Sequence, residues 1–266
     1  MKEIKGGITA AKGFKAASCA AGIKYKDRTD MTMVYSEKEA VCAGTFTTNR
    51  VKAACVKWDM LVREKGVAQA IVVNSGIANA CTGKEGFDAC ESVAKAVSDE
   101  LNVDSDKVIV ASTGVIGMQL PVDKLVAGVR TMAGNLDDSI EAGTASSKAI
   151  MTTDTVNKEI AVSIEIDGKE VIIGGMCKGS GMIHPNMCTM LAFLGSDVAI
   201  TKELLQEAVS EVVNDTFNMI TVDGDTSTND TFMLLANGMS KASITSKGKD
   251  YDAFRMHLFM SAEIWP

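Results

Sequence analysis

Residues 178–194 read KGSGMIHPNMCTMLAFL, in which a glycine-rich loop leads through a proline to a short apolar run, Thr189–Leu194. The loop allows two interpretations, because the backbone N–H groups of Lys178–Gly181 can converge on an anion or can simply close a turn. It lacks the G-x-x-x-x-G-K-S/T order of a nucleotide-binding P-loop. The segment therefore points to a functional or structural loop beside an apolar element, and it excludes that phosphate-binding signature.

The same segment contains a histidine and a cysteine four residues apart, His184 and Cys188. Such a pair could be taken for a catalytic dyad. Pro185 lies between them and disfavours the helical geometry that would bring the two side chains together. A buried structural cysteine is therefore the simpler interpretation of Cys188.

Around this segment, apolar strands alternate with amphipathic helices, and several strands end in loops rich in glycine, serine and threonine. Loops at strand ends commonly carry function. The expected strands lie at residues 31–35, 40–47, 68–74, 107–111, 161–166 and 170–173, and the expected helices at 87–101, 122–132 and 202–214. Asp167-Gly168 predicts a hairpin turn between two of these strands. Residues 231–236 are apolar and fit a strand or a helical turn.

The composition is that of a globular enzyme. With 266 residues, 46% hydrophobic and 23% charged, the chain forms one large domain or two small ones and is not disordered. Three prolines against 23 glycines favour a compact α/β or α+β fold over a β-sandwich. The net charge is −7 without a basic block, so we expect no nucleic-acid partner.

The cysteines and the N-terminus indicate which cellular compartment and which kinds of metal site to expect. Seven cysteines, an odd number without C-x-x-C, and only two histidines support neither a disulfide framework nor a zinc site. Free cysteines favour a reducing compartment. The N-terminus has no apolar signal region, and no apolar run is long enough to cross a bilayer. We therefore expect a soluble cytoplasmic protein with no membrane partner and no bound metal.

Several long motifs, in order, resemble the bifunctional ornithine acetyltransferase/glutamate N-acetyltransferase family of arginine biosynthesis, the ArgJ family. They are GGITAAKGFKAA (6–17), NSGIANACTG (74–83), STGVIG (112–117) with Leu-Pro (120–121), TTDT (152–155), the 178–194 segment and FNMITVDGDTSTND (217–230). The resemblance extends from about residue 1 to about residue 258. It implies a layered α/β (α+β) fold, with β-sheets between helices, that of the self-processing N-terminal-threonine acyltransferases (DmpA/ArgJ-like).

The resemblance also implies self-cleavage of the Cys188–Thr189 bond, although family members usually have alanine at position 188. The products would be an α fragment, 1–188, and a β fragment, 189–266, which stay together as an α2β2 assembly. The Thr189 hydroxyl would first attack the preceding carbonyl, and the resulting ester would hydrolyse. The freed α-amine, with a reference pKa of about 8, would then serve as the base that the weakly nucleophilic hydroxyl needs.

The remaining site residues follow from the same resemblance. Thr113, through its hydroxyl, and Gly114, through its N–H, would form the oxyanion hole, and Thr152, Lys178 and Thr189 would contact substrate. From the residues alone, a simple turn is the favoured interpretation of 112–114, and Lys178 could be a solvated surface lysine. The acidic loop with Asp223, Asp225 and Asp230 could suggest a cation, but its spacing is not that of an EF-hand, family members need no metal, and we expect a hydrogen-bonded structural turn. No bound cofactor is implied; acetyl-CoA is an alternative acetyl donor.

The resemblance predicts an acetyltransferase that moves an acetyl group from N2-acetylornithine to glutamate through acetyl-Thr189. From about Phe259 to Pro266 the residues no longer resemble the family, so we expect a C-terminally truncated chain without the family's substrate-binding glutamate. Two alternatives stay open. One is a related N-terminal-nucleophile amidase or aminopeptidase, and the other is an inactive fragment that only binds acylated amino acids or a partner.

Overall fold

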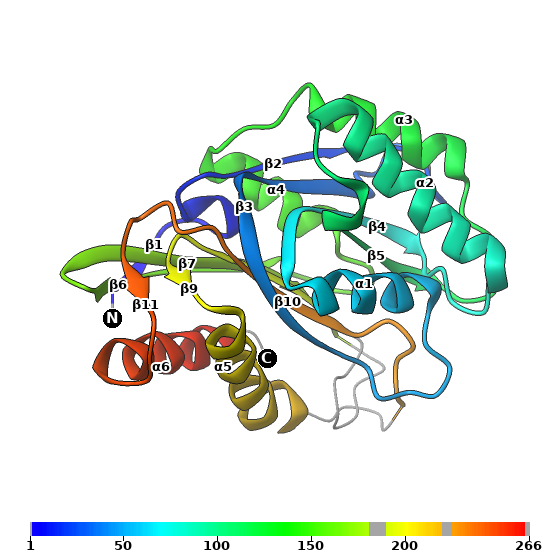
Figure 1. Ribbon diagram of the computed structural model, residues 1–266. Helices are drawn as coiled ribbons and strands as arrows, with labels where there is room; N and C mark the ends of the chain where they lie inside the picture. The colour runs from blue at the N-terminus through cyan, green and yellow to red at the C-terminus, as the bar shows by residue number, and fades with distance from the viewer. Residues whose placement is uncertain (1, 181–189, 220–224, 264–266) are drawn as a thin grey trace.

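The computed structural model describes residues 2–180, 190–219 and 225–263 (Figure 1). The strands are β1 Lys2–Ile4, β2 Phe14–Cys19, β3 Met31–Phe46, β4 Val67–Ile77, β5 Val108–Val115, β6 Lys158–Ile166, β7 Lys169–Lys178, β8 Leu191–Ser196, β9 Ala199–Ile200, β10 Thr231–Ala236 and β11 Ser243–Ile244. The α-helices are α1 Ala54–Lys65, α2 Gly83–Leu101, α3 Val122–Ala133, α4 Ile140–Ala149, α5 Lys202–Asp215 and α6 Lys249–Glu263. None of the helices in these ranges is long and apolar enough to span a membrane.

Within the described ranges, nine strands form one mixed sheet in the order β1-β6-β7-β8-β10-β3-β4-β5, with β2 also paired to β3. The long strand β3 joins two halves of this sheet, because its first part pairs with β2 and β4 while its last part pairs with β10. Side chains from both halves meet in one cluster, which includes Ile71, Ile109, Phe193 and Met233. The sheet therefore folds over a shared apolar core.

Strands β8 and β10 are buried along their whole length, and their side chains alternate between two cores. Leu191 and Phe193 belong to the cluster between the sheet halves, whereas Ala192 and Leu194 belong to the cluster under α5 and α6. A strand covered on both faces can be apolar at every position. This two-sided burial explains the continuous apolar run at the end of the 178–194 segment.

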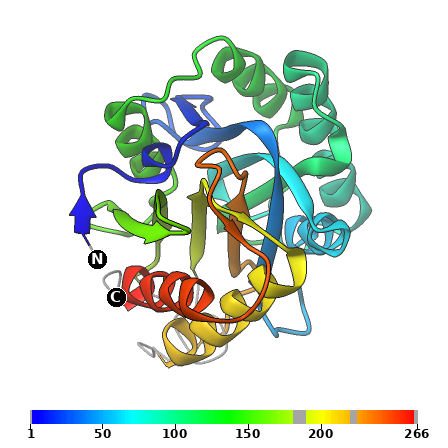
Figure 2. The same cartoon turned by 60° about the vertical axis from the view of Figure 1, so that its left-hand side comes forward.

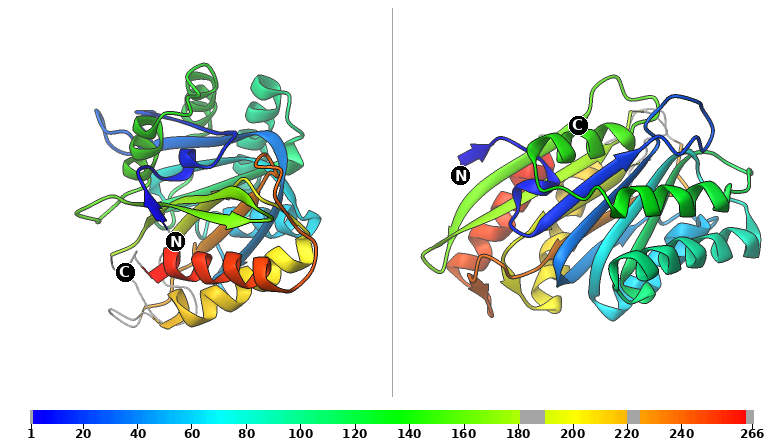
Figure 3. Two further views of the ribbon diagram at one scale, coloured as in Figure 1. Left: turned by 90° about the vertical axis from the view of Figure 1, so that its left-hand side faces the viewer. Right: turned by 90° about the horizontal axis from the view of Figure 1, so that it is seen from above.

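The helices cover the outer faces of the two sheet halves. α1, α2 and α3 pack on the β4–β5 half through one apolar cluster, and α5 and α6 pack on the β6–β7–β8–β10 half through another. Figures 2 and 3 show these two helical layers on opposite sides of the strands. The expected layered α/β architecture is thus confirmed.

The strands and helices expected from the apolar patterns are present, with one merger. The predicted strands at 31–35 and 40–47 are parts of the single strand β3, whose register with β4 shifts between Tyr35 and Ala40. The exposed residues 37–39 lie at this irregularity, which is why the apolar pattern breaks there. Residues 231–236 form a strand. Asp167 and Gly168 have φ of 52° and 64°, which confirms the hairpin turn.

Helices α1 and α4 were not expected from the sequence. α4 reads IEAGTASSKA, in which small and polar residues hide the apolar periodicity. Its start is nevertheless well defined, because the Ser139 side chain accepts the N–H of Ala142 as an N-cap. The predicted fragment boundary, Cys188–Thr189, lies outside the described residues.

Candidate active site

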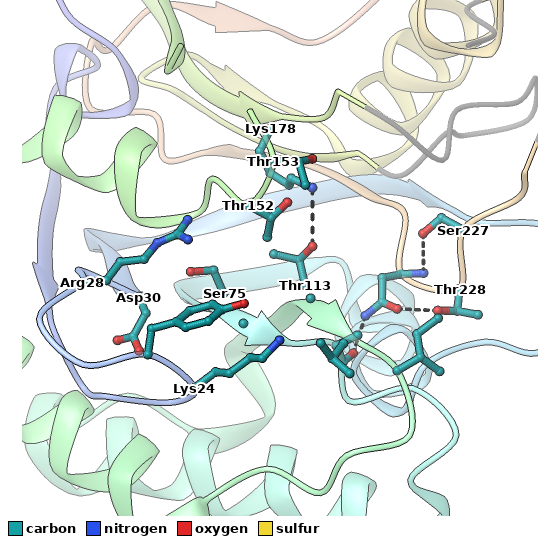
Figure 4. A pocket seen from close by; sticks show the side chains of 17 residues that line it. Lys24, Arg28, Asp30, Ser75, Thr113, Thr152, Thr153, Lys178, Ser227 and Thr228 are labelled. Atoms are coloured by element: carbon teal, nitrogen blue, oxygen red, sulfur yellow. Dashed lines mark hydrogen bonds between the residues drawn. The ribbon is translucent and has the colours of Figure 1, made fainter. Parts of the chain in front are cut away.

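A cavity of about 400 Å³ lies where the parallel strands β4 and β5 end (Figure 4). Its wall combines the β2–β3 loop, these two strand ends, the loop after α4, the end of β7 and the segment before β10. Thr113, Gly114, Thr152 and Lys178 all line it. Cys188 and Thr189 lie outside the described residues. The cavity therefore brings together four of the residues that the motifs assign to acyl transfer.

Lys178 ends β7 and is only 2% exposed, so its interpretation as a solvated surface lysine is wrong. Its Nζ lies 3.5 Å from the Thr113 Oγ1. Burial lowers the pKa of Lys178, while the nearby Asp154 and Asp230 act in the opposite direction. Burial is the larger of these effects, so the pKa of Lys178 lies below its usual value.

Asp154, in the TTDT motif, anchors the loop around Lys178. Its carboxylate accepts the N–H of Gly179 at 2.7 Å and the N–H of Thr152 at 3.2 Å. Burial alone would raise the pKa of Asp154, but the Gly179 N–H and the positive charge of Lys178 outweigh this effect and lower it. Asp154 therefore stays ionised, and one carboxylate fixes the backbone at Thr152 and at Gly179, the residue after Lys178.

The end of β5 carries both predicted oxyanion-hole residues. Gly114 has a φ of +134°, which residues with a side chain rarely adopt. A Cβ at Gly114 would lie 2.2 Å from the carbonyl carbon of Gly76, at the end of β4. Thr113 beside it is 4% exposed. Residues 113 and 114 are thus part of two tightly paired strand ends, and only glycine fits at position 114.

Asn229 ties this strand end to the segment before β10. Its amide group donates to the carbonyl oxygens of Ala78 at 2.5 Å and Ser112 at 2.8 Å, and the residue is 5% exposed. The Ser112 carbonyl belongs to the peptide unit that leads into Thr113. Asn229 belongs to the predicted β fragment, and it thereby fixes the end of β5, which belongs to the predicted α fragment. Leaving such buried carbonyls unpaired costs about 1–3 kcal/mol each.

Asp230 is buried beside the first described residue after the predicted cleavage point. Its Oδ1 accepts the N–H of Met190 at 3.0 Å, and its Oδ2 has no hydrogen-bond partner in the described part of the chain. Burial raises the pKa of Asp230 to about 8, although the Met190 N–H and the charge of Lys178 favour the carboxylate. Asp230 therefore fits the hydrogen-bonded structural turn that we expect for the acidic loop. Asp223 lies outside the described residues.

The raised pKa of Asp230 predicts a pH dependence of stability. The unfolded chain releases this proton near pH 4 and the folded chain near pH 8, so between these values the folded state binds more protons. Stability contributed by the protonated form is therefore lost as pH rises through this window, by at most about 1.4 kcal/mol per pH unit. Asp230→Asn can still accept the Met190 N–H. We expect its urea-unfolding free energy to fall less between pH 5 and pH 8 than that of the parent.

The control for this measurement is Asp215→Asn, at the exposed end of α5. This substitution should leave the pH dependence of the unfolding free energy unchanged. An Asp230→Asn variant with the same pH dependence as the parent would show that Asp230 is already ionised in the folded protein.

Sequence reasoning missed four residues of this site. Asp154 and Asn229 lie within motifs that had been singled out, TTDT and TSTND, so a buried polar role could have been inferred from their position. Lys24 and Arg28 lie in the β2–β3 loop, where no motif marks them. Their place at the cavity follows only from the folded chain.

Comparison with known proteins places these motifs in a family context. A sequence profile of the ArgJ family matches residues 15–263. The arginine biosynthesis bifunctional protein ArgJ of Synechocystis sp. is 48% identical over 247 residues, which cover 92% of this chain and 59% of that protein. The protein of the same name from Caldanaerobacter subterraneus is 47% identical over 255 residues, 96% of this chain and 62% of its own length. The chain thus spans about three fifths of the curated relatives it matches.

Solved structures of similar sequence carry related names. The arginine biosynthesis bifunctional protein ArgJ of Bacillus halodurans is 40% identical, with a TM-score of 0.65 over 71% of this chain and 98% of that chain. An ornithine acetyltransferase of Mycobacterium tuberculosis, solved with ornithine, gives 37% identity and the same TM-score over 71% of this chain and 99% of its own. An L-aminopeptidase/D-Ala-esterase/amidase of Ochrobactrum anthropi, described as a variant of the Ntn-hydrolase fold, matches 99% of this chain with a TM-score of 0.62. Its identity is 12%, so this likeness concerns the fold alone.

Proposed function

This chain belongs to the ArgJ family, and we propose that it transfers an acetyl group from N2-acetylornithine to glutamate through an acetyl ester on Thr189. In the first step the Thr189 hydroxyl oxygen bonds to the acetyl carbon, and ornithine leaves with the proton. In the second step the glutamate amine takes the acetyl group, giving N-acetylglutamate and restoring the hydroxyl. The observation that carries the proposal is the single cavity lined by Thr113, Gly114, Thr152 and Lys178.

Each acyl step passes through a tetrahedral oxyanion. In our proposal the Thr113 hydroxyl and the Gly114 N–H donate to it. The Lys178 ammonium, 3.5 Å from the Thr113 oxygen, can donate only. It therefore occupies a lone pair of that oxygen and leaves the hydroxyl proton available for the oxyanion. Removal of one oxyanion donor typically lowers kcat by about 100- to 1000-fold.

Self-cleavage between Cys188 and Thr189 is part of the same proposal, because it produces the free α-amine that activates the hydroxyl. Two observations support it. Met190, the next residue, is held on both sides, by Asp230 at its N–H and by the Thr231 N–H at its carbonyl. In addition, 71% of this chain, about 189 residues, corresponds to 98% of the solved Bacillus halodurans chain, which is the length expected of an α fragment.

The sheet supports the proposal that the two fragments stay together. β8 and β10, from the predicted β fragment, pair with β7 and β3 from the predicted α fragment. We therefore propose that the fragments remain together after cleavage, in an α2β2 assembly without a bound cofactor, in a reducing compartment such as the cytoplasm. Acetyl-CoA is proposed as a second acetyl donor for glutamate. The described cysteines are free, in keeping with such a compartment.

The proposal is tested by incubating the purified protein with N2-acetylornithine, with and without glutamate, and quantifying ornithine, acetate and N-acetylglutamate. We expect ornithine release to require glutamate and to equal the N-acetylglutamate formed. Ornithine and acetate released without glutamate would indicate an amidase instead. Absence of turnover, with calorimetric binding of N2-acetylornithine, would indicate a binding fragment.

A further inference from the structure

The mouth of the cavity carries two basic side chains that acyl transfer does not explain. Lys24 and Arg28, from the β2–β3 loop, line the same cavity as Thr113 and Lys178. Figure 4 shows Lys24 opposite Lys178, and Arg28 at the side of the cavity. Basic side chains therefore line this cavity on the loop side as well as at Lys178.

The aromatic ring of Tyr25 and a backbone carbonyl hold these two side chains in place. The Lys24 Nζ lies 4.9 Å from the ring centre of Tyr25, and the Arg28 guanidinium carbon lies 5.9 Å from the same centre. Arg28 also donates a hydrogen bond of 2.6 Å to the carbonyl oxygen of Met151, next to Thr152. These contacts position the two cations without neutralising either charge.

The charges of Lys24 and Arg28 have no counter-ion in the described ranges. Neither forms an ion pair there, although lysines elsewhere, such as Lys15 and Lys107, do. Asp30 is the acidic residue in the cavity wall, but its two oxygens accept the N–H groups of Ala21 at 2.7 Å and Ile23 at 2.6 Å. Its carboxylate closes the loop and forms no ion pair with either cation in the described ranges.

We propose that Lys24 and Arg28 form a carboxylate-binding subsite that takes the side-chain carboxylate of an acidic amino acid. This inference rests on the proposed function, in which one cavity serves two amino acids whose side chains end in opposite charges. The planar guanidinium of Arg28 keeps donors beyond the one bound to Met151, and a carboxylate is the anion that such a donor set matches. The same pair does not favour an ammonium-ended side chain, so that of N2-acetylornithine has to lie away from this subsite. The subsite thus selects the acidic acceptor over the basic product.

The experiment measures binding and needs no turnover, so its failure can be told apart from failure of the acetyl transfer. Calorimetry of the purified protein compares L-glutamate with L-glutamine, which has nearly the same shape and no side-chain charge. We expect glutamate to bind at least 10-fold more tightly. Lys24→Gln and Arg28→Gln should each reduce this preference several-fold, and the double variant should remove it.

Lys26→Gln is the matched control, because Lys26 is exposed on the same loop but does not line the cavity. It should keep the full preference for glutamate. Arg28 also holds the loop through its hydrogen bond to Met151. Should Arg28→Gln fail to fold for that reason, the result for Lys24→Gln decides the test. Equal or undetectable binding of glutamate and glutamine by the parent, or an unchanged preference in Lys24→Gln, would overturn the proposal.

Discussion

Replacing Thr189 by alanine is expected to keep the protein as one chain of 266 residues, whereas the parent yields fragments of 188 and 78 residues (266 minus 188). The substitution removes the hydroxyl that attacks the preceding carbonyl, so neither the break nor the free α-amine can form. Acetyl transfer should fall by at least about 1000-fold, since nucleophile and base are lost together. Intact-mass measurement and N-terminal sequencing decide the outcome. In the parent, the new N-terminus should read Thr-Met-Leu.

Thr189→Ser is the matched control, because serine keeps the hydroxyl and should still give two fragments. Cys188→Ala should also cleave, because the hydroxyl and the attacked carbonyl are unchanged. A parent protein that stays whole, or a Thr189→Ala variant that is cut at the same bond, would rule out self-processing by this residue.

Substitution of Gly114 by alanine should have the second-largest effect. The new Cβ would lie 2.2 Å from the Gly76 carbonyl carbon and 2.6 Å from the Ile77 nitrogen, at a φ of +134°. The backbone atoms of β4 cannot yield cheaply, so we expect a loss of about 3 kcal/mol or more in the free energy of unfolding. Any folded protein should have its kcat lowered by at least about 100-fold, because the proposed oxyanion N–H is displaced. Urea unfolding and steady-state kinetics measure the two effects.

Gly117→Ala separates the energetic cost of a side chain at positive φ from the cost of the close contact with β4. Gly117 follows the end of β5 and has a φ of +83°, but a Cβ there would meet nothing within 4 Å. This variant should lose only about 1 kcal/mol, the cost of the left-handed backbone alone. If Gly114→Ala were no less stable than Gly117→Ala, the close contact between the ends of β4 and β5 would not limit residue 114.

Local sequence patterns predicted helices and turns correctly where one short-range conformational preference dominates. The helix expected at 87–101 is part of α2, because its apolar residues recur at helical spacing over four turns. The turn at Asp167-Gly168 follows from residues that tolerate positive φ. By contrast, the polar residues between Tyr35 and Ala40 suggested two strands, since a sequence pattern does not show that the pairing of β3 with β4 resumes at Ala40 after the irregularity.

The site shows the same division. The chain's own residues indicated the helices and strands, whereas the proposed role of Gly114 and the acyl-transfer chemistry came from the resemblance of whole motifs to the ArgJ family. Only the folded chain placed Lys178 in the interior, raised the pKa of Asp230 to about 8 and brought Lys24 to the cavity. Burial and electrostatic coupling depend on which distant segments pack together. Lys24 and Lys178 are 154 positions apart (178 minus 24), and no local pattern specifies that they meet.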